Sequence, residues 1–94
     1  MRDKIEAHMR MEERYEGLSL IYGDSKELRE KILNAIEKVK KETNLKPFVF
    51  EKISQDEPDI QSFYIEFHDD YHREGGDFFE RLLKELNIKC EKDI

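Results

Sequence analysis

Apolar residues recur every three or four positions in two stretches of this chain, the spacing of an amphipathic α-helix. The pattern predicts one helix from Asp24 to about Asn44 and a second from Asp77 to Asn87. Each begins with an aspartate followed three residues later by a glutamate, the arrangement of a capping box. The apolar positions are Leu28, Ile32, Leu33, Ala35, Ile36 and Val39 in the first helix, and Phe78, Phe79, Leu82, Leu83 and Leu86 in the second.

Shorter segments rich in aromatic and β-branched residues predict strands. They are Leu18–Tyr22, Phe48–Ile53, Ser62–His68 and Ile88–Glu91. In the third of these, Phe63, Ile65 and Phe67 alternate with polar residues and share one face of the strand. Because that face is the more hydrophobic one, we expect it to meet the core.

The order of these elements predicts a ferredoxin-like fold. After an N-terminal helix over residues 1–17, which has a thin apolar stripe and ends at Gly17, the order is β-α-β-β-α-β. That pattern gives an α+β sandwich, with a four-stranded antiparallel sheet and two helices on one face. The chain of 94 residues is therefore predicted to be one domain, residues 18–94, preceded by the helix.

Two helices on one side leave the opposite face of the sheet without an internal cover. An N-terminal helix or a second copy of the sheet could supply that cover. We therefore predict an interaction or regulatory module that forms a homodimer, or that binds a protein partner whose identity the sequence does not specify. The expected interface residues are Ile5, Met9, Ile21, Val49 and Tyr64.

Charge and composition exclude some classes of protein. Acidic residues number 23 against 17 basic ones, giving a net charge of -6, and no stretch approaches the roughly 20 apolar residues of a membrane-spanning helix. The composition excludes a membrane protein, and interleaved charges disfavour nucleic acid as a partner. The N-terminus lacks the apolar core of a signal peptide, and the single Cys90 cannot form an internal disulfide. We therefore expect a cytoplasmic protein.

One loop carries candidate metal ligands. His68, Asp70 and His72 offer the imidazole and carboxylate groups that Zn, Mn or Fe would take, provided that the loop curls. The alternative function is therefore a divalent-metal-dependent enzyme or metal-binding protein, and otherwise we expect no cofactor. A polar loop also accounts for these residues. Because the common catalytic motifs are absent from the sequence, we expect binding in preference to catalysis.

Two further alternatives remain open. The start of the second helix, with Arg73, Gly75 and Gly76, could bind an anion, as in a small-ligand sensor. The segment Tyr64–Phe67 resembles the end of the strand signature of RNA-recognition motifs, and this resemblance implies an RNA-binding module of ferredoxin-like type. The glycine and the basic residue of that signature are missing here, and the neighbouring loop is acidic.

Overall fold

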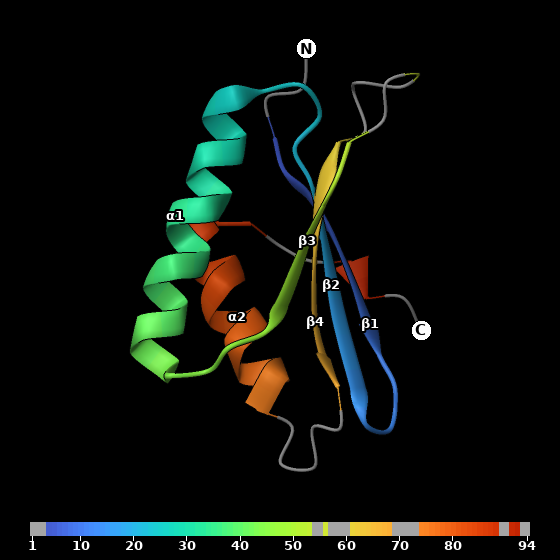
Figure 1. Ribbon diagram of the computed structural model, residues 1–94, viewed down its shortest axis with the longest axis vertical. Coiled ribbons are helices and arrows are strands. Elements are labelled where there is room, and N and C mark those ends of the chain that lie inside the picture. Colours follow the sequence, from blue (N-terminus) through green and yellow to red (C-terminus); the bar gives the residue numbers. More distant parts are fainter. Residues whose placement is uncertain (1–3, 54–55, 57–60, 69–73, 89–90, 93–94) are drawn as a thin grey trace.

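The computed structural model describes residues 4–53, 56, 61–68, 74–88 and 91–92 (Figure 1). These residues form two helices and five strands. In chain order they are β1 (Glu6–Met11), β2 (Tyr15–Ile21), α1 (Lys26–Thr43), β3 (Phe48–Lys52), β4 (Ser62–His68), α2 (Glu74–Leu86) and β5 (Glu91–Lys92).

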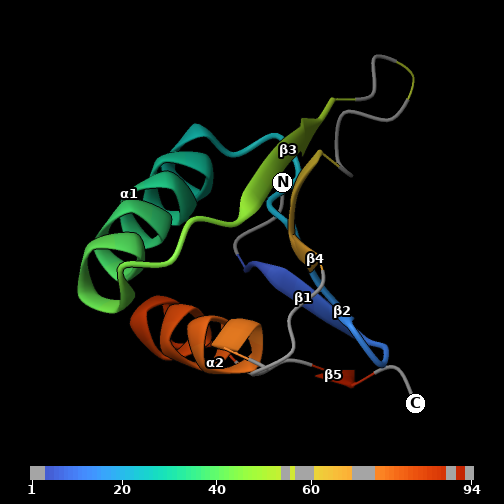
Figure 2. The same ribbon diagram turned by 60° about the horizontal axis from the view of Figure 1, so that its bottom comes forward.

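The strands form one sheet in the order β3-β4-β2-β1-β5. The first four are antiparallel neighbours, and β5 runs parallel to β1. The connection β2-α1-β3 skips one strand, and β4-α2-β5 skips two in the opposite direction. Because β2 and β4 also run in opposite directions, right-handed crossovers bring both helices to the same face. Figure 2 shows α1 and α2 packed side by side there.

The helix predicted over residues 1–17 is wrong. Its described residues form β1 and the start of β2, an antiparallel hairpin. Ile5 and Met9 are four positions apart, a separation that fits a helix and a strand equally well. Ala7 distinguishes the strand from the helix. Ile5, Ala7 and Met9 are all buried, and burial of every second residue is the pattern of a strand. Gly17 does not end a helix but lies inside β2.

The hairpin also changes the sheet topology. The α+β class, with two helices on one face of a largely antiparallel sheet, is confirmed. The strand β1, however, lies between β2 and β5, so the last strand pairs with β1 and not with β2. The sheet therefore contains an extra strand, β1, between the first and the last strands of the predicted pattern.

The core lies between the helices and one face of the sheet. Phe63 and Ile65 are buried there, as the alternation in β4 predicts, and Phe67 packs edge-on against Phe78 and Phe79 at ring-centroid distances of 5.4 and 5.7 Å. The other large buried residues of the core are Leu18, Leu20, Tyr22, Ile32, Ile36, Val39, Leu82 and Leu86. Within the described part of the chain, neither helix is long and apolar enough to cross a bilayer.

The helix starts differ from the predicted ones. The N-cap of α1 is Ser25, whose hydroxyl accepts a hydrogen bond from the Leu28 amide at 3.2 Å. Helix α2 begins at Glu74, so Asp77 lies inside the first turn and forms an ion pair with Arg81 at 3.1 Å. Because aspartate is as good an N-cap as serine, the sequence alone could not choose between neighbouring cap positions.

Candidate functional site

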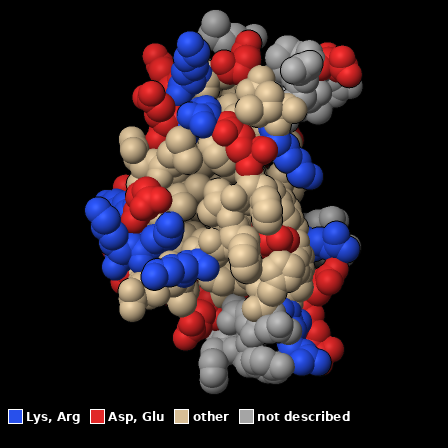
Figure 3. All heavy atoms as spheres, in the orientation of Figure 1, with Lys and Arg blue, Asp and Glu red and all other residues tan. Residues whose placement is uncertain are grey.

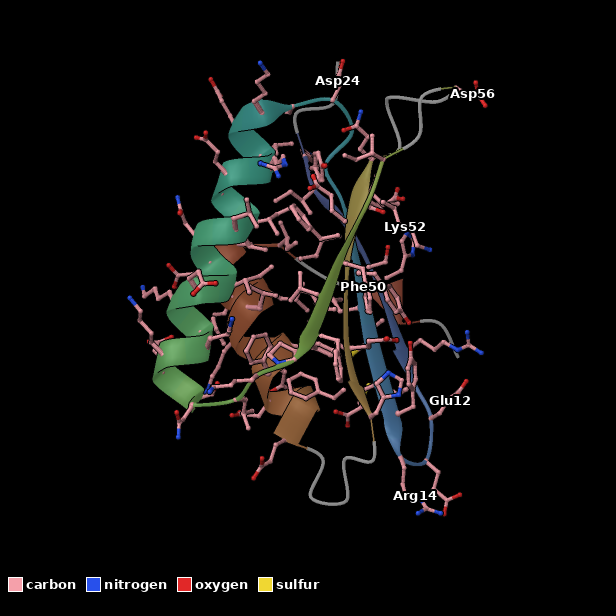
Figure 4. All side chains as sticks on the ribbon, viewed as in Figure 1. Glu12, Arg14, Asp24, Phe50, Lys52 and Asp56 are labelled. Carbon is pink, nitrogen blue, oxygen red and sulfur yellow. The ribbon has the colours of Figure 1, made fainter. Side chains whose placement is uncertain are left out.

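The candidate site is the face of the sheet that points away from the helices, which we call the open face. Its side chains alternate with the buried ones of each strand. No described element covers it. In Figure 4, Phe50 and Lys52 point away from the helices on this side. The larger side chains of the open face are His8, Arg10, Tyr15, Ile21, Phe48, Phe50, Lys52, Tyr64, Glu66 and His68.

A hydrogen-bonded cluster occupies the middle of the open face. The Tyr15 hydroxyl contacts the Tyr64 hydroxyl and donates a hydrogen bond to Glu66 Oε2 at 2.7 Å. The other oxygen of that carboxylate, Oε1, lies 3.0 Å from His68 Nε2. The rings of Tyr15 and His68 also meet edge to face, with centroids 5.3 Å apart. We call these four residues the tyrosine cluster.

Gly17 makes room for the tyrosine cluster. A Cβ atom at this position would overlap the Tyr64 hydroxyl and would come within 2.8 Å of the Tyr64 Cζ atom and 3.0 Å of the Tyr15 hydroxyl. The glycine in the middle of β2 is thus explained by the close approach of two aromatic side chains over its backbone.

Two members of the tyrosine cluster have pKa values shifted away from neutrality. Hydrogen bonds from His68 and Tyr15 hold the pKa of the Glu66 carboxyl below its usual range, so this group stays ionised. Burial, together with the hydrogen bonds to Tyr64 and Glu66, raises the pKa of the Tyr15 hydroxyl, which keeps its proton. A tyrosine that keeps its proton is a hydrogen-bond donor and not a base or nucleophile. The cluster therefore orders the open face.

Beside the cluster, β3 and the residue that follows it expose apolar side chains at the edge of the sheet. Phe48, Phe50 and Ile53 are 59%, 49% and 64% exposed, and Val49 is 37% exposed. We call these four residues the β3 edge. Figure 3 shows the central region around β3 as a surface with few charged side chains. Singly exposed apolar residues are ordinary, but a contiguous group of this size is typical of an interaction surface.

Two contacts join the strand β3 to the tyrosine cluster. The ring of Phe48 meets His68 edge to face, with centroids 5.7 Å apart. The ammonium group of Lys52 lies 5.7 Å from the centre of the Tyr64 ring, within the range of a cation–π contact. The cluster and the edge therefore form one surface.

On the helix side, β3 is anchored by a second polar cluster. Arg29 of α1 makes a bidentate ion pair with Glu51, with nitrogen–oxygen distances of 2.6 and 3.0 Å, and the Tyr22 hydroxyl donates to the same carboxylate. Hydrogen bonds from Arg29 hold the pKa of Glu51 below its usual range, and burial is the main cause that raises the pKa of Tyr22 to about 12. These contacts fix the position of the edge strand against α1.

The predicted interface residues divide between the two sides of the sheet. Tyr64 and Ile21 lie on the open face, as expected. Val49 pairs with the buried Ile65 and faces the helices, but it remains exposed because β3 is an edge strand. Ile5 and Met9 are in the core, at 7% and 9% exposure, since Met9 belongs to β1 and Ile5 directly precedes that strand, and neither is part of an N-terminal helix.

Sequence reasoning missed three aromatic members of the surface, Tyr15, Phe48 and Phe50. Tyr15 was assigned to the N-terminal helix, so its place beside Tyr64 could not be inferred. The signal for the other two was present in the strand Phe48–Lys52. Phe48 and Phe50 stand two positions apart there, so both rings lie on the same face of the strand. An edge strand with such a face exposes its rings.

Only one of the three predicted metal ligands lies among the described residues. His68 ends β4 and contacts Glu66, whereas Asp70 and His72 lie outside the described residues. Among the residues that the structure describes, no three acidic, histidine or cysteine side chains are grouped as metal ligands. The metal site stays a prediction.

The predicted anion site is occupied by a carboxyl group of the protein itself. Gly75 and Gly76 lie in the first turn of α2, and Arg73 is outside the described residues. The fully buried carboxylate of Glu16 lies against these glycines, since a Cβ at Gly75 would overlap its Oε2 and one at Gly76 would lie 3.9 Å from its Oε1. A carboxylate is stabilised at a helix N-terminus, and it would repel an anionic ligand there.

Comparison with known proteins adds no family to this description. No protein-family model matches the chain, and neither a curated protein nor a solved structure resembles it at a significant level. The open face, with its tyrosine cluster and the β3 edge, is therefore the basis on which a function can be argued.

Proposed function

We propose that this protein is a small interaction module that associates with copies of itself through the open face and the β3 edge. The observation that carries the proposal is the β3 edge, where two phenylalanines of β3 and the isoleucine that follows the strand are each about half exposed or more. Burial of such rings is the main favourable term in protein association.

The chemistry of the open face also supports binding over catalysis. The Glu66 carboxylate of the tyrosine cluster accepts a hydrogen bond from the Tyr15 hydroxyl and lies 3.0 Å from His68 Nε2. A catalytic acid or base needs a pKa near the working pH, whereas Glu66 and Tyr15 are shifted away from neutrality in opposite directions. The cluster thus supports a rigid surface for a partner.

Light scattering coupled to size exclusion, with sedimentation equilibrium over roughly 1 to 500 µM, tests this proposal. We expect the mass to rise from monomer to dimer with concentration, and Phe48→Ser to weaken the association. Met11→Ser is the matched control, because Met11 is also exposed, at 41%, but faces the helix side of the sheet. A monomer throughout that range would refute the proposal, and one bound metal per chain would favour the metal-dependent alternative.

We also propose that the fold is a variant of the ferredoxin-like pattern, with β1 inserted between β2 and β5. Without β1, the element order is that of the predicted split βαβ arrangement. A cytoplasmic location remains our proposal, supported by the single cysteine in the sequence.

A further inference from the structure

Among the residues that the structure describes, β3 is the last strand on one side of the sheet, and the register shows which of its backbone groups point outward. The Tyr22 amide donates to the Gln61 carbonyl at 3.0 Å, so alternate residues of β4 from Gln61 onward bond to β2. The remaining β4 residues, Ser62, Tyr64 and Glu66, then bond to β3. Their partners there are Lys52, Phe50 and Phe48.

It follows that Val49 and Glu51 direct their N–H and C=O groups away from the sheet. The same alternation holds on the other side of β2, where the Glu12 amide donates to the Tyr15 carbonyl at 2.8 Å. The backbone of Tyr15 therefore bonds on the β1 side of β2, and the backbone of Tyr22 bonds on the β4 side. Because Tyr15 and Tyr22 are an odd number of residues apart, the two hydrogen bonds agree on one alternation along β2.

The two edges of the described sheet differ in their protection. The strand β5 is two residues long, Glu91 and Lys92, and both are charged. The strand β3 is five residues long, with Pro47 before it and the charged Glu51 and Lys52 at its end, and its first three residues are Phe48-Val49-Phe50. Natural sheets protect a free edge by keeping it short, charged or interrupted by proline, and the segment Phe48-Val49-Phe50 contains neither a charged residue nor a proline.

We propose that β3 pairs antiparallel with β3 of a second copy, with Phe50 opposite the partner's Phe50. This inference rests on the proposed function, because it specifies how the chain associates with itself. In this register Val49 and Glu51 exchange about four main-chain hydrogen bonds with the partner's Glu51 and Val49. The two sheets become one continuous sheet about a two-fold axis through Phe50.

The side chains favour this register over the two alternatives in which the partner strand is shifted by two residues in either direction. A shift in one direction places Glu51 opposite the partner's Glu51, and a shift in the other places Lys46 opposite the partner's Lys52. Like charges directly opposite one another destabilise a strand pair. In the proposed register Phe48 lies opposite the partner's Lys52, an aromatic–cation pair, and Phe50 meets its own copy across the axis.

The phenylalanine pair falls where side chains approach most closely. Residues opposite each other without hydrogen bonds have Cα atoms about 4.5 Å apart, closer than in hydrogen-bonded pairs. Phe50 is such a residue at the outer edge, since its own backbone groups bond to Tyr64 within the chain. The pairing would therefore bury the rings of both copies and extend the open face across the dimer.

Two sets of variants of the full-length chain test the pairing by sedimentation. Val49→Pro removes the outward N–H without breaking a hydrogen bond to β4, so we expect a dissociation constant raised by about tenfold or more. Val49→Thr keeps the N–H and the β-branched shape, and should dimerise like the unchanged protein. If Val49→Pro loses cooperative unfolding, the second set decides.

Position 50 provides that second set, because each copy there faces itself. Phe50→Glu and Phe50→Lys should each be monomeric at concentrations where the unchanged protein dimerises, and a mixture of the two should recover the dimer through a Glu–Lys pair. Failure of the mixture to dimerise would overturn the pairing. If the unchanged protein dimerises but neither set weakens it, this inference fails and the proposed function stands. A protein that never dimerises refutes both.

Discussion

Gly17 is the position where a single methyl group should disturb the open face most. Its replacement by alanine places a Cβ atom in the space of the Tyr64 hydroxyl and within 2.8 Å of Cζ of the same ring. The ring cannot shift without losing its contact with the Tyr15 hydroxyl. Because Tyr15 also donates to Glu66, the displacement strains the whole tyrosine cluster.

The expected size of the effect is set by opposing contributions. Alanine in a strand is favoured over glycine by about 0.5–1 kcal/mol. Overpacking costs about 1–3 kcal/mol, and loss of a hydrogen bond adds about 1 kcal/mol. We expect Gly17→Ala to lower the free energy of unfolding by about 1–3 kcal/mol. For a chain of 94 residues, that corresponds to a fall in Tm of roughly 5–15 °C.

Urea and thermal unfolding followed by circular dichroism, at one fixed protein concentration, would measure this loss. A double-mutant cycle with Tyr64→Ala isolates its cause, because removing the ring should abolish most of the cost of Gly17→Ala. Two results would refute the reasoning: Gly17→Ala as stable as the unchanged protein, or the same cost with and without the Tyr64 ring.

Two other predictions concern the core side of the sheet. Gly75→Ala should destabilise the protein by about 1–3 kcal/mol, because its Cβ would overlap a buried carboxyl group, whereas Gly76→Ala, with 3.7 Å to the nearest atom, should be neutral or slightly stabilising. Equal Tm values for the two variants would contradict this. Because Arg29 lowers the pKa of Glu51 in the folded state, its contribution to stability is present above the unfolded pKa and is lost as the pH falls below about 4. In acid titrations of urea unfolding, Glu51→Gln should therefore show a weaker loss of stability below that pH, and an unchanged slope would argue against the ion pair.

Both helices could be predicted from the sequence because their apolar residues repeat over several turns. The β1–β2 hairpin could not be predicted, since two features of its sequence obscure the alternation of buried and exposed residues that is typical of a strand. Ile5 and Met9 fit either period, and Glu16 places a charged residue at a buried position of β2. A buried carboxylate is rare in sequence statistics, and its position at the start of α2 becomes clear only from the tertiary structure.

The candidate site was predicted in part for the same reason. The alternation within β4 placed Tyr64, Glu66 and His68 on one face, and the structure agrees. Their contacts to Tyr15 and Phe48 depend on which strands are neighbours and in which register. Register is a tertiary property wherever strands are not joined by a tight turn, so local sequence patterns do not contain it.

The place of β1 between β2 and β5 has a consequence for how the chain is assembled. The pair formed by His8 and Glu91 joins the first described strand to the last, so it encloses nearly the whole chain. The entropy of closing so long a loop must be offset by contacts already formed, and such non-local pairings slow folding. During synthesis, the outer edge of β1 has no partner within the chain until residue 91 has left the ribosome. A sheet that forms before β5 has docked therefore has two open margins, β3 and β1, and the docking of β5 closes the second.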